Sequence, residues 1–209
     1  MRNKLNRFLV GVRRNAFNRV RFGAGAPRFN QKIWIAPSRE IVYFGKRPAD
    51  RKSVLYGKVI TGVWPFDKLQ PMAERLKMQV CHRRWVRGMS WEEAGAYKWM
   101  EETLKKKQEI DGCRCRQDII DRYKKLDDIY YKVKKNNGFD SDFYITVHVG
   151  PDGALFFGFG GGAHRLAMAH ILDLPIQARV GLVHFQGIPS LQNYSSRTRF
   201  FINSSEAGI

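Results

Sequence analysis

Three consecutive glycines stand between a predicted strand and a predicted helix in residues 154–172, and this order determines where the backbone must turn. Glycines allow the backbone to approach a ligand closely, and the free amides at a helix N-terminus attract anions. A histidine and an arginine at the same point add a hydrogen-bond donor and a planar cation that matches phosphate oxygens. The segment therefore predicts a phosphate cradle formed by Gly160, Gly161, Gly162, Ala163, His164 and Arg165. The alternative is a glycine-rich turn that serves only tight packing, with Arg165 paired at the surface.

The sequence around the glycines predicts a helix, a hairpin, a second helix and a closing strand. Apolar residues at helical spacing predict the first helix over residues 117–136, and alternation of apolar and polar residues predicts a half-buried strand over 143–149. A Pro-Asp-Gly turn follows, and the closing strand is predicted over residues 177–184. Together these elements predict an α+β domain over residues 117–185.

The chain before this domain is expected to be mixed and mostly helical. Pro71 suits the first turn of a helix over residues 71–87. The capping box Ser90-Trp91-Glu92-Glu93 predicts a second helix that runs to about residue 106. Short strands are predicted over residues 33–35 and 41–44. The expected division is a basic helix with a linker (1–26), a mixed, mostly helical region (27–116), the α+β domain (117–185) and a C-terminal tail (186–209).

Positive charge is concentrated in the N-terminal part of the chain. The sequence has 37 Lys and Arg against 19 Asp and Glu, a net charge of +18. Residues 1–58 hold 15 of the basic residues and two acidic ones, whereas residues 141–209 carry equal numbers of both. This asymmetry predicts an anionic partner for the basic part and a different role for the neutral part.

Residues 1–22 predict a basic amphipathic helix. Its apolar residues recur at spacings of three and four: Leu5, Phe8, Leu9, Val12, Ala16 and Val20. Such a helix can bind an anionic membrane surface, a phosphorylated glycan or nucleic acid, act as a cleaved transit segment, or pack its apolar stripe on the domain.

Two further features bear on where the protein is located. No apolar run reaches the about 20 residues that a membrane-spanning helix needs. The odd number of 3 cysteines indicates a reducing compartment and not a disulfide scaffold. We therefore expect a cytoplasmic protein that can lie peripherally on a membrane.

The glycine segment, the helix after it and the closing strand through Pro175 and Val180 resemble the ParB/sulfiredoxin superfamily. Sulfiredoxin carries a Gly-Gly-Cys-His-Arg motif that holds ATP phosphates. ParB uses a related Gly-x-x-Arg motif for cytidine triphosphate, and a free-serine kinase of this fold has Asp-Gly-x-His-Arg. The resemblance implies a small mixed sheet with helices, and phosphate-binding roles for Gly161, Gly162, His164 and Arg165. More loosely, four other segments look like those of uncharacterised bacterial and viral members: Gly62-Val63-Trp64, Arg87–Trp91, Tyr123–Ile129 and Val183-His184.

Two departures from the family motif remove groups that do chemistry in its members. Ala163 stands at the position of sulfiredoxin's nucleophilic cysteine, which excludes sulfinic acid repair by that thiolate. Gly161 stands at the position of the kinase aspartate, which removes a metal ligand or base. The resemblance therefore supports anion binding by these residues more strongly than it supports catalysis.

The function expected first is that of an ATP-dependent phosphotransferase, acting with Mg²⁺ on an unknown acceptor such as a glycan or a lipid-linked sugar. His164 and Arg165 would stabilise the transferred phosphoryl group, and Asp142 is the candidate acid or base. The resemblance adds Lys125 and Lys132, because the equivalent helix of sulfiredoxin contacts phosphate, although a solvated face explains them equally well. No separate metal site is predicted. The alternative function is a non-catalytic, ParB-like module in which nucleotide switches the binding of nucleic acid.

Overall fold

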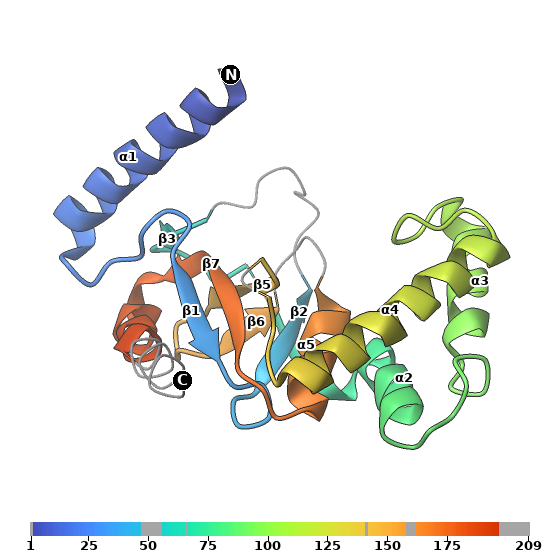
Figure 1. Ribbon diagram of the computed structural model, residues 1–209. Coiled ribbons are helices and arrows are strands. Elements are labelled where there is room, and N and C mark those ends of the chain that lie inside the picture. Colours follow the sequence, from blue (N-terminus) through green and yellow to red (C-terminus); the bar gives the residue numbers. More distant parts are fainter. Residues whose placement is uncertain (1, 47–55, 66, 141, 158–161, 197–209) are drawn as a thin grey trace.

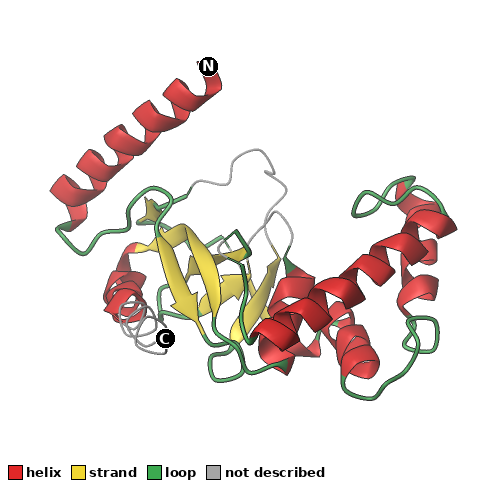
Figure 2. Cartoon of the chain, viewed as in Figure 1, coloured by secondary structure: helices red, strands yellow, loops and turns green. Residues whose placement is uncertain are grey.

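The computed structural model describes residues 2–46, 56–65, 67–140, 142–157 and 162–196. These residues form an α+β fold around one mixed sheet (Figure 1), and Figure 2 shows the helices gathered outside the strands. The expectation of an α+β chain is therefore confirmed. Gly160 and Gly161, on which part of the predicted cradle depends, lie outside the described residues.

Within the described part of the chain, seven strands form the sheet in the order β1-β7-β5-β6-β2-β4, and β3 also pairs with β7. Their bounds are Lys32–Ile35 (β1), Val42–Lys46 (β2), Lys58–Ile60 (β3), Asp67–Pro71 (β4), Tyr144–Val149 (β5), Leu155–Phe157 (β6) and Ile176–His184 (β7). β5 runs parallel to β7 and antiparallel to β6, so the sheet is mixed. β1 pairs with the first half of β7 and β3 with its last residues.

β5 is covered on both faces, which corrects the prediction of a half-buried strand over 143–149. Thr146 and His148, the polar residues of the alternating pattern, are 5% and 2% exposed. His148 is tolerated inside because the pairing of β5 with β7 shifts register beside it. The amide of Leu182 there donates a hydrogen bond to Nδ1 of His148 (2.7 Å). His148, a polar residue of a central strand, is therefore hydrogen-bonded to the backbone and is not exposed to solvent.

One hydrophobic core spans the boundary that was expected at residue 117. β1 to β4 come from the N-terminal side of that boundary and join β5 to β7 in the same sheet. Ile33 and Ile35 of β1 belong to the same buried cluster as Ile145 and Val147 of β5. Residues 188–196, assigned to a tail, are helical, and Leu191 among them is buried in that cluster. The described residues on both sides of position 117 therefore form one structural unit.

α2 to α5 gather at one side of the sheet, whereas α1 stands apart from it at the other side (Figure 1). The helices are α1 (Arg2–Phe22), α2 (Leu76–Trp85), α3 (Ala96–Lys107), α4 (Arg116–Asn136) and α5 (Ala163–Ile171), with short 3-10 turns at Met72–Glu74 and Phe185–Gly187. None of the described helices is both long enough and apolar enough to cross a membrane.

Two predicted helices begin later than the sequence indicated. Pro71 is the last residue of β4, where it pairs with Tyr43, and not the first turn of a helix. Ser90 and Glu93 do form the two reciprocal hydrogen bonds of a capping box, at 2.8 and 3.1 Å. The regular helix α3 nevertheless begins only after Gly95, whose left-handed φ of 87° interrupts the first turn.

The carboxylate of Asp127 joins α4 to α2 and to the turn that follows α2. It accepts hydrogen bonds from the indole nitrogens of Trp85 (2.9 Å) and Trp91 (3.0 Å) and from Nη2 of Arg84 (2.7 Å). Trp85 also stacks on Tyr130 of α4, with the ring centroids 4.5 Å apart. Since a buried indole N–H needs an acceptor, this carboxylate is a structural centre and not a free acid.

We expect Asp127→Asn to lower the free energy of unfolding by about 2–4 kcal/mol, because an amide cannot accept from all of these donors at once. The matched control is Asp128→Asn, which changes the neighbouring, exposed carboxylate and should cost less than about 0.5 kcal/mol. Urea unfolding followed by circular dichroism measures both values. Equal losses in the two variants would contradict a structural role for Asp127.

Candidate functional site

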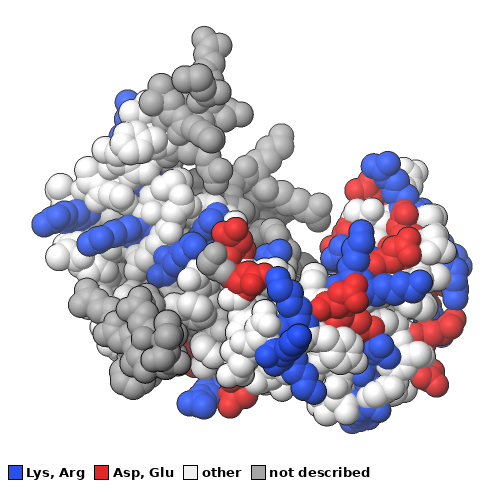
Figure 3. Space-filling model, in the orientation of Figure 1, with Lys and Arg blue, Asp and Glu red and all other residues white. Residues whose placement is uncertain are grey.

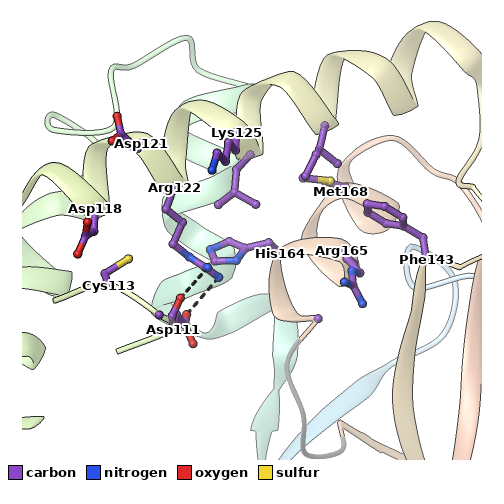
Figure 4. Close-up of a pocket in the computed structure, with 14 residues that line it drawn as sticks. Asp111, Cys113, Asp118, Asp121, Arg122, Lys125, Phe143, His164, Arg165 and Met168 are labelled. Carbon is purple, nitrogen blue, oxygen red and sulfur yellow. Dashed lines mark hydrogen bonds and ion pairs between the residues drawn. The ribbon is translucent and has the colours of Figure 1, made fainter. Parts of the chain in front are cut away.

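A cavity of about 540 Å³ lies between α4 and α5, with residues 111–113 on a further side (Figure 4). Charged side chains from these elements line it: Asp111, Asp118, Asp121, Arg122, Lys125 and Arg165. Apolar walls come from Leu126, Ile129, Phe143 and Met168, and Gly112, Cys113, Gly162 and His164 complete the lining. Small-molecule sites typically have volumes of about 300–1,000 Å³ and a similar mixture of apolar walls with a few polar groups.

Gly162 is the residue directly before α5, and two structural constraints already require a glycine there. Its φ of 105° is left-handed, and a Cβ would lie 3.0 Å from Cγ2 of Ile145 on β5. The packing alternative considered for the glycine segment therefore accounts for this position. The position nevertheless places the N-terminus of α5, which begins at Ala163, at the wall of the cavity, where an anion is favoured.

His164 is buried and neutral, which changes the role expected for it. Its side chain is 6% exposed, and its ring lies edge-on to Tyr123 with the centroids 5.9 Å apart. Burial, together with the positive charges of Lys77 and Arg122, lowers the pKa of the imidazole to about 3. The ring cannot act as a cation at neutral pH, so it can offer a phosphoryl group at most one N–H.

The Nε2 atom of His164 is buried and has no hydrogen-bond partner among the described residues. Nε of Arg122, which lines the same cavity, is in the same state. Buried polar atoms in native proteins almost always have a partner, which is a protein group, an ordered water or a ligand. Neither nitrogen exposes surface to the cavity, so a molecule bound there would reach them only after these side chains moved.

Arg165 lines the cavity but is partly engaged by its own fold. Its Nη1 donates a hydrogen bond to the carbonyl of Tyr144 (2.9 Å), and its guanidinium lies 4.9 Å from the ring centroid of Phe143. In Figure 4 its side chain points in a different direction from the imidazole of His164. The two side chains therefore point apart, although both residues belong to the cavity lining.

Arg122 and Asp111 interact across the cavity wall, a contact that the sequence analysis did not identify (Figure 4). Nη1 of Arg122 donates to the carbonyl of Asp111 (2.8 Å), and Nη2 lies 3.6 Å from the Asp111 carboxylate. That carboxylate also accepts from Nζ of Lys77 on α2 (2.7 Å). Burial alone would raise the pKa of Asp111, but the Lys77 ammonium and the Arg122 guanidinium hold it below its usual value. Helix spacing could have placed Arg122 beside Lys125, whereas Lys77 and Asp111 meet only in the tertiary fold.

The two candidate lysines on α4 differ in position. Lys125 lines the cavity, and no described residue forms an ion pair with it. Lys132 lies outside the cavity lining and pairs with Asp140 (2.9 Å), so the solvated-face explanation holds for Lys132. Asp142, the candidate acid or base, is exposed and is also outside the lining. The next residue, Phe143, does line the cavity, so the chain passes the cavity here without placing the Asp142 side chain in its lining.

Two other carboxylates, Asp118 and Asp121 on α4, occupy the cavity in place of Asp142. Asp118 accepts hydrogen bonds from the amides of Arg114 (2.8 Å) and Cys115 (3.2 Å), and so caps the helix. Asp121 accepts from the side chain of Gln117 (2.9 Å) and is exposed. Over the described ranges, no group of three or more His, Cys, Asp or Glu side chains could hold a metal ion.

The burial of His164 predicts a specific loss of stability in acid. The unfolded imidazole takes up its proton near its ordinary pKa of 6.5, whereas the folded one does so only near pH 3. Stability contributed by the neutral ring is therefore fully present above pH 6.5 and is lost as the pH falls toward 3. His164→Gln, which cannot take up this proton, should lose less stability than the wild type between pH 7 and pH 4, by on the order of 3 kcal/mol.

Urea unfolding at the two pH values measures this difference. His82→Gln is the control, since that side chain is exposed and its replacement should leave the wild-type profile unchanged. Parallel profiles for the wild type and His164→Gln would show that His164 is not held neutral by burial.

Comparison with protein-family models finds no match to this chain, and comparisons with curated proteins and with solved structures find none. The resemblance to the ParB/sulfiredoxin superfamily therefore remains a hypothesis, carried by residues 159–165 and by the helix and strand that follow them.

Proposed function

We propose that this protein binds the phosphate groups of a nucleotide in the cavity between α4 and α5. The observation that carries the proposal is the convergence of three cations from two helices on one cavity: Arg122, Lys125 and Arg165. Guanidinium groups present planar sets of donors to phosphate oxygens, and an ammonium adds a mobile point charge. The N-terminus of α5 at the same wall favours negative charge further.

Two of the three acidic residues of the lining already have partners, and Arg122 is one of those partners. Asp111 is already paired with Lys77 and Arg122, and Asp118 is occupied by backbone amides. Lys125, which has no ionic partner among the described residues, can contact a phosphate without first breaking an ion pair. Binding therefore gains a charge-assisted hydrogen bond at little cost in existing contacts.

A nucleotide fits this cavity better than a bare phosphate does. The volume of about 540 Å³ exceeds what a single phosphate occupies, and Leu126, Ile129, Phe143 and Met168 offer apolar surface for a base. The resemblance to a superfamily that binds ATP and cytidine triphosphate supports the same class of ligand. Mg²⁺ would enter with the nucleotide, because it usually binds through phosphate oxygens, water and one or two carboxylates.

Phosphoryl transfer is the second candidate function, and the position of Asp121 in the cavity favours it. In this reaction a hydroxyl of the acceptor loses its proton to the Asp121 carboxylate. The hydroxyl oxygen then bonds to the terminal phosphorus of the nucleotide, and the bond from that phosphorus to the bridging oxygen breaks to release the diphosphate. Arg122, Lys125 and Arg165 would stabilise the charge on the transferred group. The nucleotide-switched nucleic-acid module remains the alternative that uses the same cavity without this reaction.

Lys125→Ala should weaken nucleotide binding about tenfold or more, because it removes a charge-assisted contact worth about 1.5–3 kcal/mol. Titration calorimetry with ATP and cytidine triphosphate, with and without Mg²⁺, measures the affinity. Lys132→Ala is the matched control on the same helix, since Lys132 pairs with Asp140 outside the cavity. The proposal fails if neither nucleotide binds the wild type, or if both lysine variants lose affinity equally.

Asp121→Asn should lower phosphoryl transfer about 100-fold or more while nucleotide affinity changes only a few-fold, because an amide cannot accept the acceptor's proton. Transfer of labelled phosphate from ATP to water or to candidate sugar acceptors provides the assay, with Asp128→Asn as the control carboxylate on α4. If bound nucleotide is not turned over, but changes the affinity for nucleic acid in a salt-dependent manner, the switch is the correct function.

A further inference from the structure

The middle of α1 is attached to the rest of the chain through polar contacts, and Phe22 at its end packs against the hydrophobic core. Nδ2 of Asn18, which is 2% exposed, donates to the carbonyls of Pro27 and Gly57, both at 2.7 Å. Nη1 of Arg14 donates to the carbonyl of Tyr56 (2.8 Å), and Oδ1 of Asn15 accepts from the amide of Phe29 (2.7 Å). These residues share one face of the helix.

The opposite face of α1 presents an apolar stripe to solvent. Leu9, Val12 and Val20 are 45%, 51% and 88% exposed, and Ala16 lies between them on the same face and is also exposed. Phe8 and Phe17 flank this stripe at 65% and 55% exposure. From Leu9 to Val20 the stripe therefore does not pack on the domain, and the side chains of Asn15 and Asn18 face the protein instead.

The charge of α1 restricts what can cover the stripe. The helix contains seven Arg and Lys residues and no acidic residue. Arg13 and Arg19 border the stripe and are exposed. In Figure 3 the part of the surface around α1 shows basic and uncharged residues without acidic ones. A second copy of α1 would bring like charges together, so self-association through this face is opposed. A partner must offer an apolar layer that can bury the stripe, together with negative charge that can pair with the arginines.

We propose that α1 binds the surface of an anionic lipid membrane, lying in its plane with the Leu9–Val20 stripe inserted and the arginines at the headgroups. A helix with aliphatic and aromatic residues on one face and basic residues around it binds membranes in this manner. Each Lys or Arg near an anionic surface adds attraction. Nucleic acid would use the arginines, but it offers no apolar layer in which Leu9, Val12 and Val20 could be buried.

The position of α1 in the fold permits this binding. Figure 1 shows α1 apart from the sheet and on the side away from α2, α3 and α4. The cavity between α4 and α5 is therefore remote from the stripe, and the proposal does not depend on nucleotide binding.

Sedimentation of the full-length chain with vesicles tests the proposal. The wild type should bind vesicles of equal parts phosphatidylglycerol and phosphatidylcholine at least tenfold more tightly than pure phosphatidylcholine vesicles. The double variant Leu9→Glu/Val20→Glu should lose at least tenfold in affinity for the anionic vesicles. Both positions are exposed, so the thermal midpoint should stay at the wild-type value.

The matched control is Ile41→Glu/Val63→Glu, which places the same two charges at apolar residues that are 60% and 93% exposed elsewhere. This variant should bind the anionic vesicles within about twofold of the wild type, because lipid contact and not net charge is being measured. The proposal is overturned if the wild type ignores anionic vesicles, or if the two double variants lose affinity equally. A stripe variant that keeps vesicle binding but loses binding to an RNA or DNA oligonucleotide would also overturn it. So would a stripe variant whose only defect is a loss of self-association, measured by sedimentation velocity.

Discussion

The carboxylate of Asp127 holds the helical layer in one arrangement, and the candidate site depends on that arrangement. Two indole N–H groups and an arginine from α2 and the turn after it converge on this one side chain of α4. Because a buried donor left without an acceptor is costly, α4 cannot slide along α2 without breaking the set. α2 packs in turn on α5. The two walls of the cavity, α4 and α5, are therefore held at a fixed separation by contacts that do not themselves belong to the cavity.

The cavity differs from an exposed basic patch because several of its charged or titratable side chains are already paired or neutral. Asp111, the acidic residue in contact with Arg122 of α4, is already paired with Lys77 and Arg122. The imidazole of His164 is kept neutral by burial and by the same neighbouring cations, which lower its pKa. What remains open is one lysine, part of two guanidinium groups and the carboxylate of Asp121, beside an apolar wall. Such a combination suits a ligand with an anionic end and a flat apolar end.

The segments that carry the looser resemblance to the superfamily meet in two places, where each has a structural role in this chain. Nε2 of His184 lies 3.1 Å from the carbonyl of Gly62, and its ring lies edge-on to Trp64 with the centroids 6.1 Å apart. Trp91 lies against Tyr123, with centroids 4.6 Å apart, and bonds to Asp127. A sequence pattern presents such residues as candidates for function, whereas their contacts show that they join elements distant in the chain.

The sequence by itself determined most of the local elements and several residues of the cavity lining. Periodicity located α1 and α4 within a residue, and the hairpin and the order β5, β6, α5, β7 followed from alternation and glycines. It also indicated Gly162, His164, Arg165 and Lys125 as residues of one anion-binding region, and the structure places all four at one cavity. Local patterns suffice for these features because the backbone preferences that create them act over a few residues.

Only the tertiary structure decided how the elements combine. It joined β1 to β4 with the C-terminal strands in one sheet, buried His148 and His164, and turned the apolar stripe of α1 outward. It also placed Asp121 and Arg122 in the cavity lining and left Asp142 and Lys132 outside it. Strand partners, the pKa of an imidazole and the direction of an amphipathic face all depend on groups far apart in the chain. Their proximity comes from packing, which no local pattern records.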